Sequence, residues 1–284
     1  MLVSLKEILQ LAENEKFCIP AFNVYNMETV MGVLAAAEEK RAPVIMQIYP
    51  RLMREETGYF LSPVVVAAAH KATVPVCFHL DHGPSELETT RALRWGATGI
   101  MLDGSTLPFA ENIALTERVV KTCACLRIGV EGELGHIGTT HDETADEFTT
   151  PEDAREFAER TNVCCLAVAV GTAHGRYQKP PKLDIERIRA IREATGGLPL
   201  VLHGGSGVPD AEIRRAVEAG IRKMNFATDI CYAFLDACLL ELQSPNCSVA
   251  IDNFMKKPIG AVKDFCMSRI ELVGADNRAR YAPC

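Results

Sequence analysis

Short apolar runs alternate with longer amphipathic segments along the whole chain. Eight of the runs have the length of buried strands, and their apolar residues follow one another without polar alternation. Continuous apolar runs of this kind are typical of a parallel sheet covered by helices on both faces. The predicted strands are residues 17–22, 43–48, 76–80, 99–102, 128–133, 166–170, 200–202 and 221–224.

Helix-forming segments separate these strands, and several begin with recognisable start signals. Proline or acidic residues stand in the first turn at 84–88, 150–153 and 208–212, where a missing N–H costs nothing and the helix dipole favours negative charge. Two more helices are predicted after the eighth strand, over 229–242 and 260–273. This alternation over 284 residues predicts an α/β single domain, a (β/α)8 TIM barrel with additional C-terminal helices.

Composition and charge limit which partners the protein is expected to bind and in which compartment it is expected to lie. The formal net charge of −7 and the pI of about 5.6 offer no electrostatic reason to bind nucleic acid or an anionic membrane. No stretch approaches the roughly 18 uninterrupted apolar residues of a membrane span. Eleven cysteines without a CxxC pair, in a chain without a signal-peptide pattern at its start, predict reduced thiols and a cytoplasmic protein.

Three histidines follow three different strands, each next to a glycine. His82, His174 and His203 occupy these positions, and the active site of a barrel lies at the carboxyl ends of its strands. Neutral imidazole is the commonest ligand of catalytic zinc, which typically keeps three protein ligands. The pattern predicts a zinc site, or a site for another divalent metal. His79 lies within a strand and is predicted to be a core residue, and His70 is given no role.

Carboxylates stand beside these histidines. Asp81 immediately precedes His82, and Glu131 and Glu133 share one face of their strand by its period of two, so at least one should point into the barrel mouth. Burying an acid is costly unless a positive partner compensates it, and a divalent cation is such a partner.

Glycine-rich segments after the last two strands suggest an anion site. His203 is followed by Gly-Gly-Ser-Gly, and Asn-Phe-Ala-Thr at 225–228 opens a helix. Barrels commonly bind phosphate at this place through backbone N–H groups and a helix N-terminus. The most polar stretch, 141–147, is equally consistent with a loop that closes over the mouth and with a plain solvated loop.

Taken together, the motifs resemble those of class II, metal-dependent ketose-bisphosphate aldolases. The similarity is closest to the branch of tagatose-1,6-bisphosphate and fructose-1,6-bisphosphate aldolases, and it covers nearly the whole chain. It is carried by His-Leu-Asp-His-Gly at 79–83, Val-Glu-Gly-Glu-Leu-Gly at 130–135, Ala-Val-Gly-Thr-Ala-His-Gly at 169–175, Leu-His-Gly-Gly-Ser-Gly at 202–207 and Asn-Phe-Ala-Thr at 225–228.

The resemblance implies a role for each matching residue. Asp81 matches the catalytic acid/base, Asn23 a substrate-contacting asparagine, and Arg278 falls near a C-terminal arginine that can reach the distal phosphate. The metal ligands implied are His82, His174 and His203, with Glu133 as a carboxylate near the metal. The family often adds a monovalent cation, Na⁺ or K⁺, beside dihydroxyacetone phosphate, whose binding residues match Gly175, Gly204, Gly205, Ser206, Asn225, Phe226, Ala227 and Thr228.

The implied reaction explains why these groups are needed. Breaking the C3–C4 bond of a ketose 1-phosphate leaves an enediolate, which a Lewis acid can stabilise, while Asp81 would take the proton of the C4 hydroxyl. A Schiff-base route is disfavoured because the sixth predicted strand, 166–170, has no lysine. The expected activity is reversible cleavage of a phosphorylated sugar, and we expect a homodimer or homotetramer.

Two positions depart from the family pattern. His141, followed by Asp142, stands where the family has a loop glutamate, so His141 is the first candidate and Asp142 the second for proton transfer to the enediolate. Tyr49 replaces a small serine or threonine and should narrow the acceptor side of the site.

Two other functions are compatible with the same barrel. A metal-dependent hydrolase usually carries a paired-histidine motif after its first strand, where this chain has Ala-Phe-Asn at 21–23. A catalytically silent paralogue that supports a partner aldolase subunit would have no need of the three histidines, Asp81 and the phosphate motif.

Overall fold

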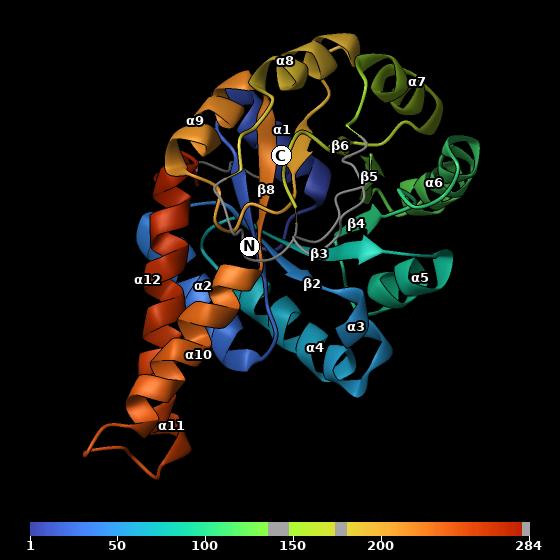
Figure 1. Ribbon diagram of the computed structural model, residues 1–284. Coiled ribbons are helices and arrows are strands. Elements are labelled where there is room, and N and C mark those ends of the chain that lie inside the picture. The colour runs from blue at the N-terminus through green and yellow to red at the C-terminus, as the bar shows by residue number, and fades with distance from the viewer. Residues whose placement is uncertain (136–147, 174–180, 280–284) are drawn as a thin grey trace.

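The computed structural model shows the eight predicted strands closed into one barrel (Figure 1). It describes residues 1–135, 148–173 and 181–279. The strands are parallel and pair in sequence order, and the eighth returns beside the first. Their bounds are β1 Ile19–Asn23, β2 Val44–Ile48, β3 Val76–Gly83, β4 Gly99–Leu102, β5 Gly129–Leu134, β6 Cys165–Val168, β7 Leu200–Leu202 and β8 Ile221–Phe226.

Helices surround the barrel and confirm the (β/α)8 prediction (Figure 1). None of those in the described ranges is both long and apolar enough to cross a bilayer. Their bounds are α1 Leu5–Glu15, α2 Met27–Lys40, α3 Pro50–Arg54, α4 Glu56–Lys71, α5 Glu86–Arg94, α6 Phe109–Ala124, α7 Pro151–Thr161, α8 Ile185–Ala194, α9 Asp210–Ala219, α10 Thr228–Leu242, α11 Ile251–Phe254 and α12 Lys256–Leu272.

The C-terminal helices lie where the sequence predicted them, with one correction. α12 begins at Lys256, before the predicted start at 260. Pro258 stands in the first turn of the helix, where a backbone N–H has no partner within the helix and proline is tolerated. α10 and α12 pack on each other, α12 also packs on α2, and the end of this pair around α11 projects from the barrel as an arm (Figure 1).

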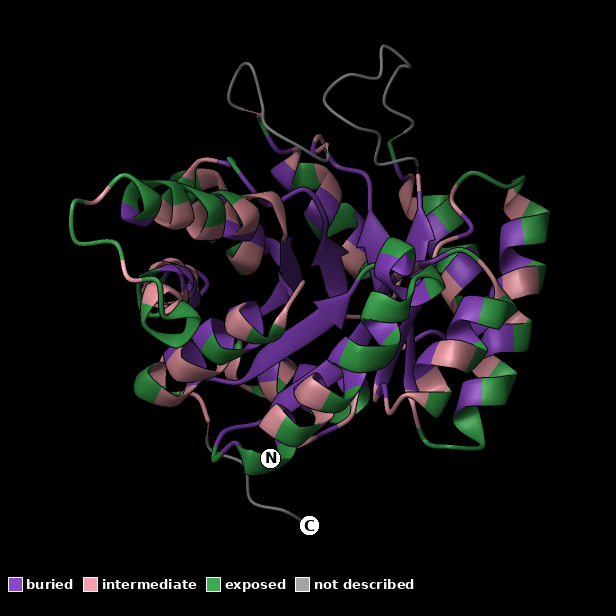
Figure 2. Cartoon of the chain, turned by 90° about the horizontal axis from the view of Figure 1, so that it is seen from below, coloured by how far each residue is buried: buried purple, intermediate pink, exposed green. Residues whose placement is uncertain are grey.

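Helix α1 lies across the amino-terminal end of the barrel. Ser4 and Glu7 form a reciprocal capping box at its start, and its buried face carries Leu5, Ile8 and Leu9. The helix contacts β1, β3, β4, β5 and β8. The N-terminus lies at the end of the barrel that α1 covers (Figure 2), which leaves the carboxyl ends of the strands as the accessible mouth.

A layer of polar side chains fills the barrel just below that mouth. Gln47 of β2, His79 of β3, Glu131 of β5 and Lys223 of β8 are completely buried, and the strands as a whole are drawn in the purple of buried residues in Figure 2. Such groups are stable in a core only when they bond to one another or to neighbouring polar atoms. The polar layer therefore supports the groups at the mouth.

Candidate active site

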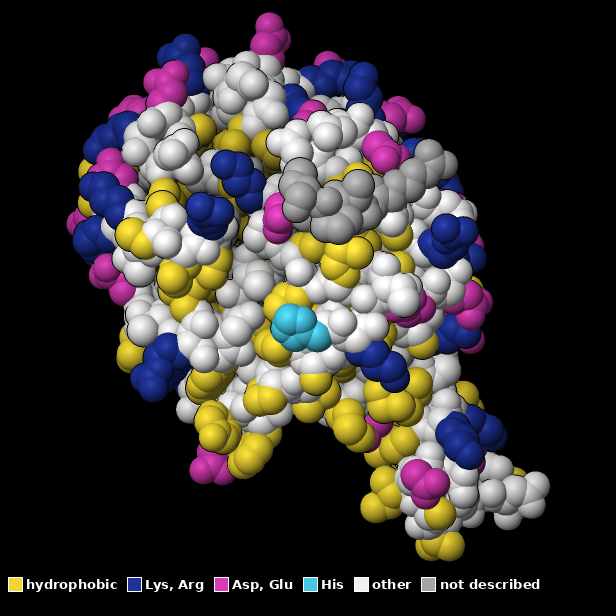
Figure 3. All heavy atoms as spheres, turned by 180° about the vertical axis from the view of Figure 1, so that it is seen from behind, with side chains coloured by type: hydrophobic (Ala, Val, Ile, Leu, Met, Phe, Trp, Pro, Cys, Tyr) yellow, Lys and Arg dark blue, Asp and Glu magenta, His cyan; other side chains and the backbone are white. Residues whose placement is uncertain are grey.

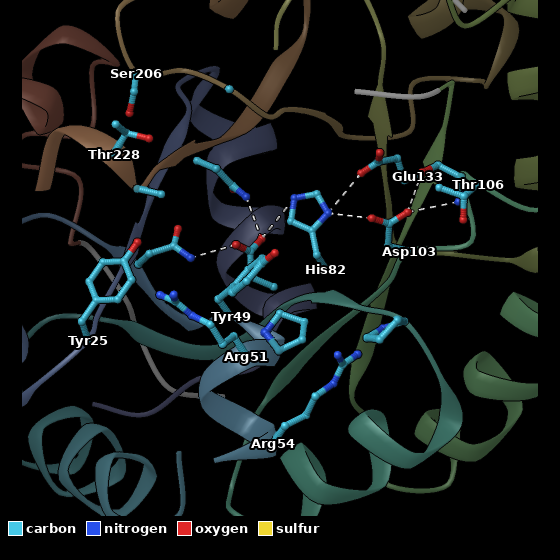
Figure 4. A pocket seen from close by; sticks show the side chains of 18 of the residues that line it. Tyr25, Tyr49, Arg51, Arg54, His82, Asp103, Thr106, Glu133, Ser206 and Thr228 are labelled. Atoms are coloured by element: carbon cyan, nitrogen blue, oxygen red, sulfur yellow. Dashed lines mark hydrogen bonds and ion pairs between the residues drawn. The ribbon is translucent and has the colours of Figure 1, made fainter. Parts of the chain in front are cut away.

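A pocket of about 790 Å³ opens at the carboxyl ends of the strands, as the sequence predicted (Figure 4). Its walls come from the segments that follow most of the strands. The lining residues are Asn23, Tyr25, Tyr49, Pro50, Arg51, Arg54, Glu55, Asp81, His82, Pro84, Asp103, Ser105, Thr106, Glu133, Gly204, Ser206, Asn225, Ala227 and Thr228.

An irregularity at the end of β3 brings two consecutive residues into the pocket. Neighbouring residues of a regular strand point to opposite faces, yet Asp81 and His82 both line the cavity. The pairing of β3 with β4 shifts between Leu80 and Gly83, and His82 has a left-handed backbone with φ of 47°. Because this conformation is costly for a residue with a side chain, the local fold is specialised for placing the Asp-His pair.

His82 lines the pocket, and its ring contacts that of the buried His203 behind it. His82 Nε2 lies 2.8 Å from His203 Nδ1, and the two rings meet edge to face. The remaining nitrogen of each ring contacts a carboxylate: His82 Nδ1 lies 2.7 Å from Asp103 Oδ2, and His203 Nε2 lies 2.8 Å from Glu131 Oε1. A carboxylate behind each imidazole is the usual arrangement around metal-ligating histidines, because it sets the orientation and tautomer of the ring.

Acidic groups outnumber basic ones at this site. Four carboxylates, those of Asp81, Asp103, Glu131 and Glu133, lie around the two histidines, and Lys223 is the buried lysine among them. Burial and the neighbouring Asp103 raise the pKa of Glu133 well above its usual range, and Glu133 Oε2 is buried without a hydrogen-bond partner among the residues that the structure describes.

The neighbouring carboxylates also change the pKa of His82. Burial would lower the pKa of His82, but Asp81 and Asp103 reverse this effect and raise it to about 10. Figure 4 shows His82 directed at Asp103 and Glu133. Candidate ligand atoms of Asp81, His82 and His203 lie within 4.8 Å of one another, as do those of His82, Asp103 and Glu133. The donor set and its excess negative charge fit a divalent cation.

Two amide side chains hold Asp81. Asn23 Nδ2 donates to Asp81 Oδ2 over 2.8 Å, and Asn225 Nδ2 donates to Asp81 Oδ1 over 2.9 Å. Each amide oxygen in turn accepts a bond from the polar layer below: Gln47 Nε2 donates to Asn23 Oδ1 and Lys223 Nζ donates to Asn225 Oδ1. Burial alone would raise the pKa of Asp81, but the nearby charges of His82, His203 and Lys223 and the Asn23 bond lower it.

Lys223 links the two halves of this network. Its ammonium lies 3.0 Å from Glu131 Oε2 and 2.6 Å from Asn225 Oδ1. His79 Nε2 lies 3.2 Å from the same Glu131 oxygen, which confirms the prediction that His79 is a core residue. Burial raises the pKa of Glu131, but the Lys223 charge and the bonds from His203 and His79 lower it well below its usual range, so Glu131 is a stable anionic partner for His203.

The opposite side of the pocket has the features of an anion site. Ser206 and Thr228 lie close together there (Figure 4), and the backbone N–H of Asp229, in the first turn of α10, donates to Ser206 Oγ over 3.4 Å. Gly204 has a positive φ of 65°, and a Cβ at this position would lie 2.4 Å from the carbonyl oxygen of Ala173. Only glycine allows the chain to turn here beside the helix N-terminus.

Comparison with known proteins agrees with this site. Residues 3–278 match the family model for class II fructose-bisphosphate aldolase. The chain belongs to the class II aldolase family. As a member, it is an aldolase, a carbon–carbon lyase.

Solved structures similar to this aldolase share its whole length. The YdjI aldolase from Escherichia coli K12 is 37% identical, with a TM-score of 0.89 over 99% of this chain and 100% of that one. A protein assigned as a fructose-1,6-bisphosphate aldolase from Coccidioides immitis is 28% identical, with a TM-score of 0.88 over 98% and 99% of the two chains. The fructose-bisphosphate aldolase of Campylobacter jejuni, at 23% identity, shares the fold, with a TM-score of 0.81 over 98% and 97%.

Most of the site residues predicted from the sequence meet in this pocket. Those that line the cavity are Asn23, Asp81, His82, Glu133, Gly204, Ser206, Asn225, Ala227 and Thr228, and His203 lies directly behind His82. His141, Asp142, His174 and Gly175 lie outside the described residues.

Three residues that were predicted to contact the substrate do not line the cavity of the aldolase: Phe226, Gly205 and Arg278. Phe226 points away from it, because its ring packs on Phe22 with 5.8 Å between centroids. Gly205 does not line it either. Arg278 lies at the other end of the barrel, where its guanidinium pairs with Glu15 over 2.8 Å, so the expectation that it reaches the distal phosphate is wrong within this chain.

Sequence reasoning missed three residues of the hydrogen-bond network at the aldolase site. Asp103 directly follows β4, so the strand-end signal that identified the histidines applied to it as well. Gln47 and Lys223 interrupt apolar runs within predicted strands. A polar residue that breaks a buried strand is a signal for an internal network, because it needs a partner in the core.

Proposed function

We propose that this aldolase reversibly cleaves a phosphorylated ketose, either a ketose 1-phosphate or a 1,6-bisphosphate, into dihydroxyacetone phosphate and an aldehyde, with a divalent metal ion as cofactor. The observation that carries the proposal is the position of Asp81 beside two carboxylate-backed histidines at one pocket. Carbon–carbon cleavage next to a carbonyl requires a base for the leaving hydroxyl and stabilisation of the carbanion.

Zinc is our first candidate for the metal, and another divalent ion would suit the same ligands. His82 and His203 would hold it, with His174 as the third ligand and Glu133 as a carboxylate within reach. The excess of buried carboxylates supports this assignment, whereas the part of His174 rests on its sequence position alone. When bound, the ion supplies the Lewis acid that stabilises negative charge on the dihydroxyacetone phosphate half.

Asp81 would act as the base for the acceptor half. During cleavage it takes the proton of the C4 hydroxyl, the C4 oxygen becomes the aldehyde carbonyl, and the electrons of the C3–C4 bond stay on C3. The bonds from Asn23 and Asn225 favour the ionised form that this step needs. In condensation Asp81 returns the proton.

A second proton must reach C3 of the donor half. His141 is our first candidate for this transfer and Asp142 the second, on the grounds of their place in the sequence after β5. If His141 acts here, His141→Ala should slow exchange of the C3 proton of dihydroxyacetone phosphate with solvent while leaving the metal content unchanged.

The phosphate of the donor half would bind near Ser206 and Thr228. The first turn of α10 and the turn at Gly204 support this placement, and Gly175, Gly205 and the backbone from 225 to 228 are the remaining candidates. A monovalent cation, Na⁺ or K⁺, would help to balance the phosphate charge.

We further propose that the enzyme is a homodimer or homotetramer in the cytoplasm. Seven of the sixteen exposed large apolar side chains among the described residues lie between 232 and 251, on the projecting arm. A protein surface rarely leaves so many apolar groups together without a partner. The ten cysteines in the described ranges are free thiols, as expected in a reducing compartment.

The test is a condensation assay with dihydroxyacetone phosphate and a panel of aldehydes, run with and without a chelator. We expect about one divalent ion per chain, activity lost on chelation and restored by zinc, and no covalent trapping by borohydride. Full activity in a rigorously metal-free preparation would contradict the cofactor assignment, and failure to condense any aldehyde would contradict the reaction.

A further inference from the structure

The wall of the pocket formed by α3 carries positive charge. Arg51 and Arg54 line the cavity from this short helix, together with Tyr49 before it and Glu55 after it. Pro50 at its first position starts the helix directly after β2. The family resemblance gave these arginines no role, and Arg278, which it did suggest for a distal anion, lies at the other end of the barrel.

The two arginines differ in their partners. Arg54 Nε lies 3.3 Å from Glu88 Oε1, so its charge is already paired at the edge of the pocket. Arg51 makes no ion pair with any acidic group in the part of the chain that the structure describes. An arginine that lines a cavity without an acidic partner can accept an oxyanion in two parallel hydrogen bonds.

The position of Arg51 relates it to the far end of the substrate. Figure 4 places Ser206 and Thr228 on one side of the pocket, His82 on a second side, and Arg51 and Arg54 on a third, below both in the view. If the 1-phosphate of a ketose lies beside Ser206 and Thr228 and its reacting carbons lie near His82, the α3 wall is the remaining side of the pocket for its last carbons.

We propose that Arg51 binds an oxyanion, a carboxylate or a phosphate, at the end of the acceptor aldehyde. The inference rests on the proposed aldol cleavage and adds the chemical class of its acceptor. Tyr49 lies at the start of α3 and is 44% exposed. It lines the same wall and narrows the approach, while its hydroxyl can donate a further hydrogen bond to the oxyanion.

The experiment compares matched pairs of aldehydes in condensation with dihydroxyacetone phosphate. Glyceraldehyde 3-phosphate is paired with glyceraldehyde, and succinic semialdehyde with butanal, so that each pair differs in the charged end. We expect the enzyme to prefer the charged member of at least one pair by about tenfold or more in kcat/KM. The pair that shows the preference distinguishes phosphate from carboxylate.

The variant Arg51→Gln then assigns the preference to its residue. It should raise KM for the charged aldehyde by about tenfold to a hundredfold, as expected for loss of a charge-assisted bond, and should leave KM for the neutral aldehyde unchanged. Arg118→Gln is the matched control, because Arg118 lies on α6, pairs with Glu86 over 3.3 Å and does not line the pocket.

A separate readout distinguishes failure of this inference from failure of the aldolase proposal. Exchange of the C3 proton of dihydroxyacetone phosphate depends on the donor side of the site alone. Normal exchange with no preference for charged aldehydes, or an equal loss for charged and neutral aldehydes in Arg51→Gln, overturns the oxyanion subsite. Absence of exchange in the unmodified enzyme overturns the proposed reaction, and the subsite with it.

Discussion

At the scale of single residues, the carboxylate of Asp81 depends on contacts that extend two layers into the barrel. Asn23 and Asn225 hold its two oxygens, and Gln47 and Lys223 hold those amides. Because each amide oxygen is occupied from below, each amide nitrogen must face Asp81. The orientation of the Asp81 carboxylate therefore depends in part on Gln47 and Lys223, which do not line the cavity.

Replacing Asp81 should separate the two halves of the reaction. Asp81→Ala removes the base for the C4 hydroxyl, so cleavage should fall by roughly a hundredfold or more. Exchange of the C3 proton of dihydroxyacetone phosphate should persist, because it does not involve that hydroxyl. His82→Ala is the comparison, since loss of a proposed metal ligand should abolish both activities. Equal loss of exchange and cleavage in Asp81→Ala would contradict this division, and NMR exchange in D2O alongside a cleavage assay measures both.

Replacing Lys223 should show how much of the protein's stability depends on the buried ammonium group of this residue. Lys223→Met leaves Glu131 buried without its lysine partner, and breaking a buried ion pair in this way costs about 3–5 kcal/mol of unfolding free energy. The double variant Lys223→Met/Glu131→Gln removes the unpaired charge and should recover a large part of that loss. Urea denaturation measures both, and an additive double variant would show that the pair is not coupled.

The chemistry-bearing residues could be predicted from the sequence where a strand end marks them. Asp81, His82, His203 and Glu133 each stand at or beside a strand end. Lys223 and Gln47 could not be assigned partners, because the facing of a buried strand depends on its register in the closed barrel. Arg278 was assigned from the family resemblance, and no strand end marks its position, so the sequence did not show that it pairs with Glu15 at the end of α1.

At the scale of elements, the end of β3 determines the site. The pairing of β3 with β4 changes register before Gly83, and the left-handed backbone of His82 turns its ring into the same cavity as Asp81. The strand was predicted to end at residue 80, because polar residues follow. Parallel pairing nevertheless continues, since the backbone hydrogen bonds do not depend on the polarity of side chains that face the pocket.

A methyl group at Gly83 should disturb this irregularity. Its Cβ would lie 2.6 Å from the Met101 carbonyl oxygen, a backbone atom of β4 that cannot move aside cheaply. Gly83→Ala should lower the unfolding free energy by about 1–3 kcal/mol and reduce metal content. Gly260→Ala is the control, because nothing lies within 4 Å of its added Cβ on α12, and it should be neutral or stabilising by up to about 1 kcal/mol. Equal effects of the two substitutions would show that the end of β3 is not constrained.

The barrel fold could be predicted from the sequence because its strands are continuous apolar runs of parallel-sheet character. The short helix α3 could not be predicted, since its span from Pro50 to Arg54 is too short to show a helical period. The predicted and observed strand bounds differ most at β3, by three residues, because polar site residues rather than apolar ones continue this strand.

At the scale of the whole molecule, the arm formed by α10, α11 and α12 leaves apolar surface uncovered. Leu235, Leu239 and Leu242 follow one another at helical spacing on α10 with 59%, 54% and 65% of their surface exposed. Figure 3 shows hydrophobic side chains on the arm and along the concave edge between it and the barrel. A second copy of the chain is the partner we expect to cover this stripe.

A charge on the stripe should weaken that association. Leu239→Asp places a carboxylate in the expected interface, where burying it is costly, and should shift the protein toward monomer in sedimentation equilibrium. Leu126→Asp, at an equally exposed leucine after α6 (57%), should leave the mass unchanged. A monomeric unmodified enzyme, or an unaltered mass in Leu239→Asp, would contradict an interface at this arm.

The position of α3 separates the proposed recognition of the acceptor aldehyde from the residues proposed to carry out the chemistry. The segment from 49 to 55 faces the pocket but contributes none of the histidines or aspartates grouped at its floor. On the proposed acceptor site, divergence in this short stretch would change which aldehydes are accepted during evolution, while the chemistry of the donor half would be inherited intact. For the protein engineer, a library randomised there explores acceptors on a constant catalytic background.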